Sequence, residues 1–251
     1  MLLALLLFHF ALGLAILRVT TFSKGFGVRL GATSWALVDF RTAIYYPIVA
    51  FWDGINPYDR AALLAHYPTK EGFGLFLPAT FLLHLPFGLL PVDAASLLYF
   101  VAVVALTVLL AYVAFKFNDL EAGGPGVFLV AALIVLSRPG QWNLLLGQLA
   151  AQLTLVTYVA LYYARRSPAV SGLGLAASMV KPSIGLPLAI LMLARRDRRA
   201  VLLGCAFAAI FNLPLLAVLV RRAGGVAPFM TQLVEVQREF QGRAWNDPAI
   251  S

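Results

Sequence analysis

The sequence predicts an all-α fold, a polytopic membrane helix bundle that forms a single domain over residues 1–251. Of these 251 residues, 61% are hydrophobic and only 12% are charged, whereas a soluble domain has roughly 45–50% apolar and about 25% charged residues. The mean hydropathy is +0.87. The apolar runs are continuous, which favours helices over the alternating strands of an outer-membrane barrel. This composition excludes a water-soluble globule, a disordered chain and a disulfide scaffold.

The charge balance is basic, because 19 Lys and Arg residues against 11 Asp and Glu residues give a net charge of +8. In a soluble protein this excess would indicate a nucleic-acid partner. In a membrane protein, basic residues mostly flank helices and set their orientation. We therefore expect membrane lipids as partners and no nucleic acid.

Six apolar stretches predict about seven transmembrane helices, since a spanning helix needs about 20 apolar residues. The first lacks a basic leader and a clear cleavage site before Arg18, so we expect a retained anchor rather than a signal peptide. The stretch 170–194 is interrupted by Lys181 and Pro182, so we expect two short helices that meet there. The predicted spans are 1–17, 94–115, 127–137, 144–164, the two halves of 170–194, and 200–220.

The segment 18–93 is rich in Trp, Tyr, Pro and charge, which predicts a long first outer segment with juxtamembrane helices. Within it, residues 75–90 are apolar but interrupted by proline and glycine, so we expect a re-entrant piece that does not cross. Residues 221–251 form a polar tail.

Basic residues in the short loops set the orientation. The loops that follow residues 115, 164 and 194 hold seven basic residues, whereas the other two short turns hold only Arg138 and Lys181. The positive-inside rule places the seven in the cytoplasm. The N-terminus is then inside, and the unusual polar residues gather at the outer face, which indicates a polar or charged ligand there.

Several stretches resemble glycosyltransferase family 87, in the same order along residues 30–220. They are Val38-Asp39-Phe40, Tyr45-Tyr46, residues 54–59, Leu77-Pro78, Leu85-Pro86, Leu146-Gly147-Gln148, and residues 172–177 before Lys181-Pro182. The family's members are membrane transferases of the GT-C superfamily that use polyprenyl-phosphate sugars. The resemblance implies a GT-C-type bundle in the plasma membrane that moves a hexose, such as mannose, from that donor to a lipid or glycan acceptor on the extracytoplasmic face. It implies no cofactor besides this donor substrate.

Asp39 is the candidate catalytic residue. Family members are understood to use an acidic residue of the first outer loop as general base, and Asp39 matches that position. A carboxylate can take the acceptor proton when desolvation raises its pKa, and one displacement with one base gives inversion. Alternatively, Asp39 caps a helix or pairs with Arg41.

Lys181 is the candidate ligand of the donor phosphate, because an ammonium at a helix break in the membrane is costly unless it is paired. The half-helix after Pro182 would also direct its positive N-terminus at the anion. Alternatively, Lys181 extends to the lipid headgroups. Gln148 could bind sugar hydroxyls, or cap or pack the bundle. The other candidate substrate contacts are Arg138, which could instead contact headgroups, and Arg41, Tyr45, Asp53 and Asn56, the last also suited to shaping a turn.

Three structural expectations complete this interpretation. Asp59 should cap a short helix over residues 60–66, and Gly172 and Gly174 should allow close helix packing. The sequence carries no metal-binding spacing, so no metal site is expected. A transporter or lipid flippase is the main alternative function, because broken helices also build transport sites, and a truncated non-catalytic family member is another.

Overall fold

The computed structural model describes residues 1–23, 36–69, 72–74, 76–121 and 123–246. These residues fold into helices and contain no strand. The long and medium helices are α1 (Leu2–Ser23), α7 (Val92–Phe117), α8 (Gly124–Leu136), α9 (Arg138–Leu146), α10 (Ala150–Tyr163), α11 (Pro168–Ser178), α12 (Pro182–Ala194), α13 (Arg198–Arg222) and α14 (Val226–Asn246). The short ones are α2 (Val38–Phe40), a π-helical turn (Arg41–Tyr45), α3 (Tyr46–Trp52), α4 (Arg60–His66), α5 (Ala79–Leu83) and α6 (Leu85–Gly88).

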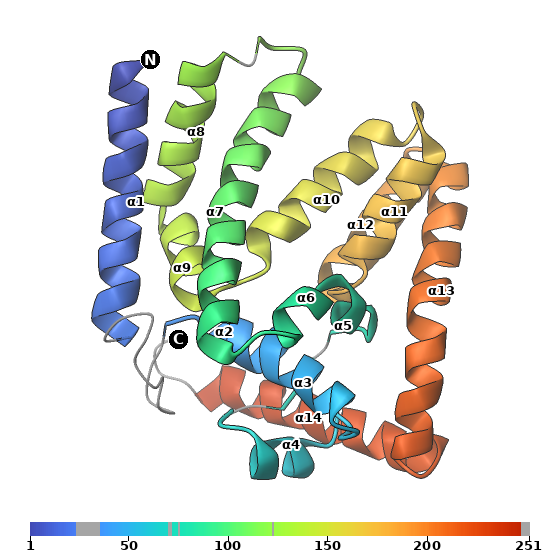
Figure 1. Cartoon of the computed structure of the whole chain (residues 1–251). Coiled ribbons are helices and arrows are strands. Elements are labelled where there is room, and N and C mark those ends of the chain that lie inside the picture. The colour runs from blue at the N-terminus through green and yellow to red at the C-terminus, as the bar shows by residue number, and fades with distance from the viewer. Residues whose placement is uncertain (24–35, 70–71, 75, 122, 247–251) are drawn as a thin grey trace.

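The helices form two groups (Figure 1). Helices α1, α8, α7, α10, α11, α12 and α13 stand beside one another as the bundle, with α1 against α8 and α11 between α10 and α13. The short helices α2–α6 and the long α14 lie across one end of this bundle. The all-α bundle is therefore confirmed, and the structure has several short helices between residues 38 and 88.

Three described helices are long and apolar enough to cross a membrane: α1 over Leu2–Thr21, α7 and α13. The pair α8 and α9, bent by 76°, raises the number to four if it counts as one span. Helices α10, α11 and α12 have 14, 11 and 13 residues, or roughly 17–21 Å at 1.5 Å per residue, against a hydrocarbon core of about 30 Å. The count of seven spans therefore stays a prediction.

One predicted boundary is wrong. The span expected over residues 144–164 begins at Ala150, because Leu144–Leu146 belong to α9. Gly147 ends α9 with φ of +71°, in the left-handed region that stops a helix. The chain then turns and starts α10 in a new direction.

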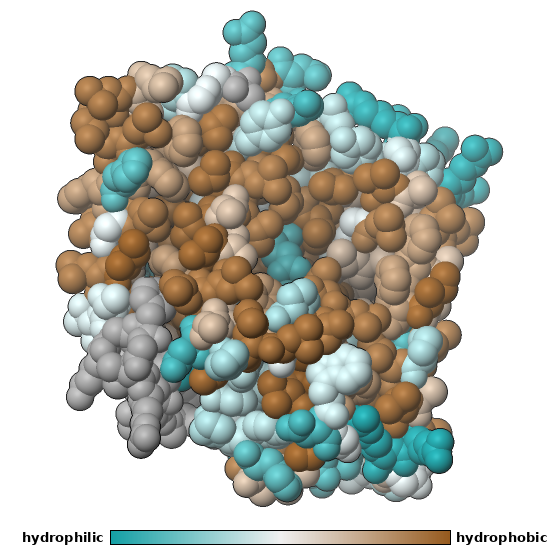
Figure 2. All heavy atoms as spheres, in the orientation of Figure 1, coloured by the Kyte–Doolittle hydropathy of each residue, from teal (hydrophilic) through white to brown (hydrophobic). Residues whose placement is uncertain are grey.

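The surface matches a membrane environment. Figure 2 shows a broad apolar belt between two hydrophilic rims. Leucine, isoleucine and valine side chains of α1, α7, α12 and α13 are among the exposed large apolar groups, including Leu109, Ile190, Leu202 and Ile210. Exposed apolar area of this extent is unfavourable in water, so these helices are suited to a lipid environment.

Small residues bring α10, α11 and α13 into close contact, as expected. A Cβ added at Gly174 would lie 2.9 Å from the backbone oxygen of Val156 in α10, and one added at Gly172 would lie 2.9 Å from the backbone nitrogen of Gly204 in α13. Without a side chain at these positions the backbones approach closely, which is how helices gain packing energy in lipid.

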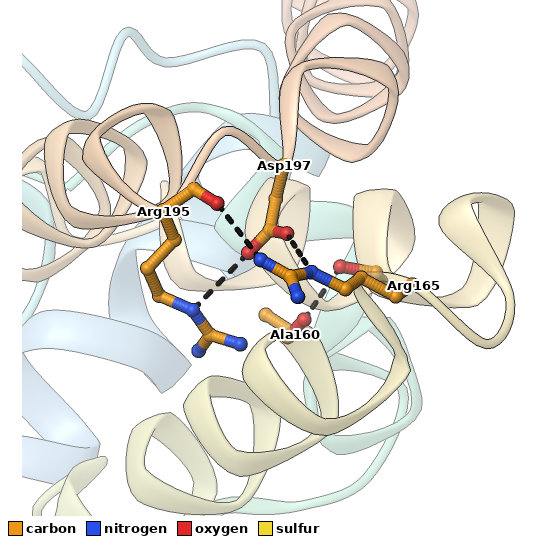
Figure 3. Close-up of polar contacts among 5 residues, drawn as sticks. Ala160, Arg165, Arg195 and Asp197 are labelled. Carbon is orange, nitrogen blue, oxygen red and sulfur yellow. Dashed lines mark hydrogen bonds and ion pairs between the residues drawn. The ribbon is translucent and has the colours of Figure 1, made fainter.

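An ion-pair cluster joins the α10–α11 and α12–α13 turns (Figure 3). The carboxylate of Asp197, which is 1% exposed, lies 3.2 Å from Nε of Arg165 and 3.2 Å from Nε of Arg195. Arg165 also donates to the backbone oxygen of Arg195, and Ser171 donates to that of Ala160. These contacts fix the two hairpins relative to each other at the end of the bundle away from α14.

The same end carries the basic short loops. The α7–α8, α10–α11 and α12–α13 turns lie at the end where α1 begins, opposite α14 (Figure 1). Lys116, Arg165 and Arg195 stand at or beside these turns. The charge pattern predicts that these basic loops lie together on one side of the bundle. The fold places the three turns at one end (Figure 1), in agreement with this prediction.

The C-terminal polar segment is more ordered than predicted. It forms α14, an amphipathic helix whose Phe229 and Val236 are buried, whereas Met230 and Glu235 are exposed. Its apolar side chains recur every three or four residues among polar ones, which is the pattern of a helix lying on a surface.

Candidate active site

A cavity of about 1020 Å³ lies where α2, the α9–α10 turn, the α11–α12 break and α14 meet. Asp39, Gln148 and Lys181 all line it. These are the three candidates that sequence analysis singles out for the base, the sugar contact and the phosphate contact. They come from segments more than 30 residues apart in the chain, and the fold brings them to one space.

Asp39 is held by an unusual local backbone. Leu37, just before α2, has φ of +53°, and its N–H donates to the backbone oxygen of Leu145 at 2.6 Å. Directly after α2 the chain continues as the π-helical turn Arg41–Tyr45. Short π-helical segments widen the helix and are frequent at functional sites. Thr42 of this turn also lines the cavity, and its hydroxyl donates to Val38.

Gly147 lets the α9–α10 turn, which carries Gln148, approach α2 closely. A Cβ at Gly147 would lie 2.8 Å from Cβ of Phe40, the residue after Asp39. Only glycine combines its positive φ with this close approach. Tyr99 of α7 supports the turn, because its hydroxyl donates to the backbone oxygen of Gln148 at 3.2 Å and its ring stacks on Phe40 at 4.2 Å.

Lys181 stands at the break between α11 and α12, as expected. The N–H of Leu77 donates to the backbone oxygen of Val180 at 2.9 Å, and the ammonium of Lys181 lies 5.8 Å from the centre of the Phe76 ring. Gly185 makes the tight break possible, since a Cβ there would lie 2.7 Å from Cα of Met179. Lys181 is exposed, and its side chain is therefore accessible to a ligand.

The first turn of α12 also faces the cavity. Pro182, Ser183 and Ile184 line it. Pro182 has no N–H and the N–H of Ile184 donates to the backbone oxygen of Lys181 at 2.8 Å, so the contribution of this helix start is mainly its dipole, roughly half a positive charge. Together with the ammonium of Lys181 it makes this wall of the cavity suited to an anion such as a phosphate.

The remaining walls are mainly apolar. Ala150, Leu153, Thr154 and Thr157 lie along one face of α10 and line the cavity over about two helical turns. Leu216 of α13 lines it from the bundle. The cavity therefore has a polar part near Asp39, Gln148 and Lys181, and a less polar part that extends between the helices.

The other candidates do not line the cavity. The guanidinium of buried Arg41 donates to the backbone oxygen of Ala36 at 2.8 Å, and burial lowers its pKa. The hydroxyl of Tyr45 donates to the backbone oxygen of Leu90 at 2.8 Å. Both side chains are thus engaged in holding the outer segment together.

Asp53, Asn56 and Arg138 also lie outside the lining. Asp53 is exposed and accepts from the hydroxyl of Tyr67 at 2.6 Å. Asn56 is buried, accepts from the N–H of Tyr58 and donates to Gln232 of α14. Arg138 is exposed at the start of α9. The turn-shaping alternative for Asn56 agrees with these contacts.

One further expectation is confirmed. Asp59 caps α4 by accepting from the N–H of Ala62 at 3.0 Å. His84 is buried and satisfied, with its ring nitrogens bonded to Gln152 and to the backbone of Thr80. Among the described residues, no three His, Cys, Asp or Glu side chains form a group that could hold a metal ion.

Sequence reasoning missed the contributions of Tyr58, Tyr99 and α14. Tyr58 lines the cavity and donates to the backbone oxygen of Phe76 at 2.6 Å. Phe229, Leu233 and Val236 of α14 also line it. The amphipathic pattern of residues 226–238 is the one sequence signal that could have identified α14, whereas nothing local marks Tyr99.

Comparison with known proteins identifies the family. The model of glycosyltransferase family 87 matches residues 76–248, which include Gln148, Lys181 and α14 but not Asp39. Neither a curated protein nor a solved structure matches the chain. The family match covers more than half of the chain and agrees with the membrane-suited helices. The chain therefore belongs to glycosyltransferase family 87 and is a membrane glycosyltransferase.

Proposed function

We propose that this enzyme transfers a hexose, such as mannose, from a polyprenyl-phosphate donor to a lipid or glycan acceptor, with inversion at the anomeric carbon. The reaction takes place at the extracytoplasmic face of the plasma membrane. Asp39 is the general base, Lys181 binds the donor phosphate, and Gln148 contacts sugar hydroxyls.

The observation that carries this proposal is the shared cavity. A carboxylate, an amide and an ammonium line one space of about 1020 Å³, next to the N-terminus of α12. This volume is at the upper end of ordinary ligand pockets, about 300–1,000 Å³, so a sugar, its phosphate and part of an acceptor fit together.

The chemistry follows from the three groups. Asp39 takes the proton of the acceptor hydroxyl as the oxygen forms a bond to the anomeric carbon. The bond from that carbon to the phosphate oxygen breaks, and the lipid phosphate leaves with the electron pair. Lys181 and the α12 N-terminus stabilise the negative charge on the leaving phosphate. The transition state is oxocarbenium-like, as in glycosidases.

The apolar walls support a lipid-linked donor over a nucleotide sugar. Leu149, Leu153 and Leu216 line the cavity among the helices, and the hydroxyl of the neighbouring Thr154 is already bonded to the backbone oxygen of Ala150, so a prenyl chain can lie there. A nucleotide would instead require hydrogen-bonding partners for its base and ribose at this position.

A transfer assay with purified protein tests the donor class. Radiolabelled mannose or glucose is offered as the polyprenyl phosphate or as the nucleotide diphosphate, with membrane lipid extract as acceptor. We expect labelled product from a polyprenyl-phosphate sugar and none from the nucleotide sugars. Transfer from a nucleotide sugar alone would contradict the proposed donor.

A further inference from the structure

Helix α14 closes the cavity on the side away from the bundle, and we propose that it is a hinged lid through which the polar acceptor enters from the aqueous side. The position of α14, the flexible junction before it and the hydrogen bonds that hold it are argued from the fold alone. Only the identity of what enters rests on the proposed function.

The inner face of α14 forms part of the cavity wall. Phe229, Leu233 and Val236 are spaced by four and three residues, so they share one side of the helix, and all three line the cavity. Phe229 and Val236 are only 3% and 1% exposed. If α14 moves away, the cavity loses this wall and opens further, beyond the access that the exposed Lys181 already provides.

The connection between α13 and α14 has the character of a hinge. Gly224 and Gly225 follow each other with φ of +84° and +132°, and both values lie in a region that other residues rarely adopt. A Cβ at Gly224 would meet nothing within 4 Å, so only the backbone hydrogen bonds from Gly224 and Gly225 to Arg221 and Val220 are seen to hold this junction among the described residues. Two glycines in the junction of two long helices can absorb a change in backbone angles.

Among the side chains of α14 that the structure describes, Gln232 makes the polar contacts with the turn before α4, and we call these contacts the latch. Oε1 of Gln232 accepts from Nδ2 of Asn56 at 2.8 Å, and Nε2 of Gln232 donates to Asp59 at 3.4 Å. Both partners belong to the turn before α4. Apolar contacts lie beside it, because the ring of Phe229 is edge-on to Tyr58 at 5.4 Å and Val236 packs near Gly72. A hydrogen bond between neutral groups contributes only about 0.5–1.5 kcal/mol net, and the bond to the carboxylate of Asp59 is long at 3.4 Å, so the latch can open reversibly.

The other walls are tied more firmly. The α2 wall is joined to α9 by the backbone hydrogen bond from Leu37 to Leu145, and the α11–α12 break is joined to the segment before α5 by the one from Leu77 to Val180. Both walls are continuous with the packed bundle. Among the described walls, α14 is therefore the one that can move without breaking backbone hydrogen bonds of this kind.

Alkylation of a cysteine inside the cavity measures opening without any substrate. Thr42 lines the cavity and is 7% exposed, so Thr42→Cys in a Cys205→Ser background reports on access. The rate of reaction with a water-soluble maleimide is compared between the intact latch and Gln232→Leu. We expect at least a threefold faster reaction when the latch is removed.

The matched control is Gln237→Leu, the same chemical change on the same helix, because the side chain of Gln237 makes no hydrogen bond to another described residue. It should leave the rate unchanged. Asn56→Leu should raise the alkylation rate as Gln232→Leu does. Combining Asn56→Leu with Gln232→Leu should raise the rate little beyond that of either single variant. Equal rates in the latch variants and the control, with all proteins folded by size-exclusion chromatography, would overturn the proposal.

A reversible lock tests whether the movement matters for turnover. A Cβ at Gly72 lies 3.5 Å from Cγ2 of Val236, so Gly72→Cys with Val236→Cys, again without Cys205, places two thiols within reach. Oxidation should reduce sugar transfer at least tenfold and reduction should restore it. Undiminished transfer by the oxidised, cross-linked protein would show that the acceptor enters elsewhere. Because the alkylation experiment needs no transfer activity, failure of the lid and failure of the proposed function are distinguishable.

Discussion

At the scale of single residues, some polar side chains face the cavity and others are occupied elsewhere. Asp39, Gln148 and Lys181 face it. Arg41 and Tyr45 instead donate to backbone oxygens within the outer segment, and Asn56 bonds to Tyr58 and to Gln232 of α14. The candidates therefore separate into a group suited to chemistry and a group suited to supporting it.

The donor-phosphate role of Lys181 predicts a binding defect. Lys181→Met removes a charge-assisted hydrogen bond worth about 1.5–3 kcal/mol, so the KM for the polyprenyl-phosphate donor should rise by about 10–100-fold. Steady-state kinetics in donor concentration measure this.

The control is Lys116→Met at the opposite end of the bundle, where the ammonium contacts Tyr112. It should leave the donor KM within a factor of two. An unchanged donor KM in Lys181→Met would mean that another group binds the phosphate.

His84 predicts a pH dependence of stability. Burial lowers the pKa of His84, so the folded protein disfavours the protonated ring. Because the unfolded chain then binds more protons, the stabilisation is present above the unfolded pKa of about 6.5 and is lost as the pH falls below it. Thermal unfolding in detergent at pH 7.5 and pH 5 measures the loss.

His84→Gln should unfold at a lower temperature at pH 7.5 but show a smaller further loss at pH 5. His66→Gln, a change at an exposed histidine of α4, should keep the pH dependence of the original protein. An identical acid-induced loss in His84→Gln would argue against this contribution.

At the scale of elements, breaks in helices position the site more than the helices themselves. Gly147 ends α9, the Lys181–Pro182 break separates α11 from α12, and the π-helical turn follows Asp39. A break that glycine or proline causes, as at Gly147 or Pro182, can be predicted from the sequence. The π-helical turn and the positive φ of Leu37 were not predictable, because contacts with distant segments such as Leu145 impose them.

The packing of α11 makes a quantitative prediction at this scale. Gly174→Ala forces a Cβ to within 2.9 Å of the α10 backbone, and such overpacking costs about 1–3 kcal/mol. The apparent melting temperature in detergent should fall.

Gly13→Ala in α1 is the matched control, because a Cβ there meets nothing within 4 Å. It should be neutral or gain up to about 1 kcal/mol from helix propensity. Equal melting temperatures for the two variants would contradict the close contact of α10 and α11.

At the scale of the whole molecule, composition and charge predict the membrane bundle, the sidedness of the loops and the end that carries the site. They do not predict the cavity itself, since its walls come from α2, the α9–α10 turn, α12 and α14. The number of spans also escapes prediction, because α10, α11 and α12 are shorter than an ordinary spanning helix.

The sidedness has a direct test with two matched cysteines in the Cys205→Ser protein. Asp53 and Asp119 are both exposed, Asp53 at the cavity end and Asp119 in the α7–α8 turn. In intact cells, a membrane-impermeant maleimide should label Asp53→Cys but reach Asp119→Cys only after permeabilisation. The reverse pattern would place the cavity on the cytoplasmic side.

The proposed reaction requires Asp39 to act as general base in the cavity that it shares with Lys181. The most direct measurement is the single-turnover rate of sugar transfer from saturating polyprenyl-phosphate donor by Asp39→Asn, with Asp119→Asn as the matched control. General-base catalysis contributes about 10²–10⁴-fold. We expect a rate loss of that size in Asp39→Asn, unchanged donor binding, and an unaffected control. A rate within a factor of three of the original protein would contradict the account.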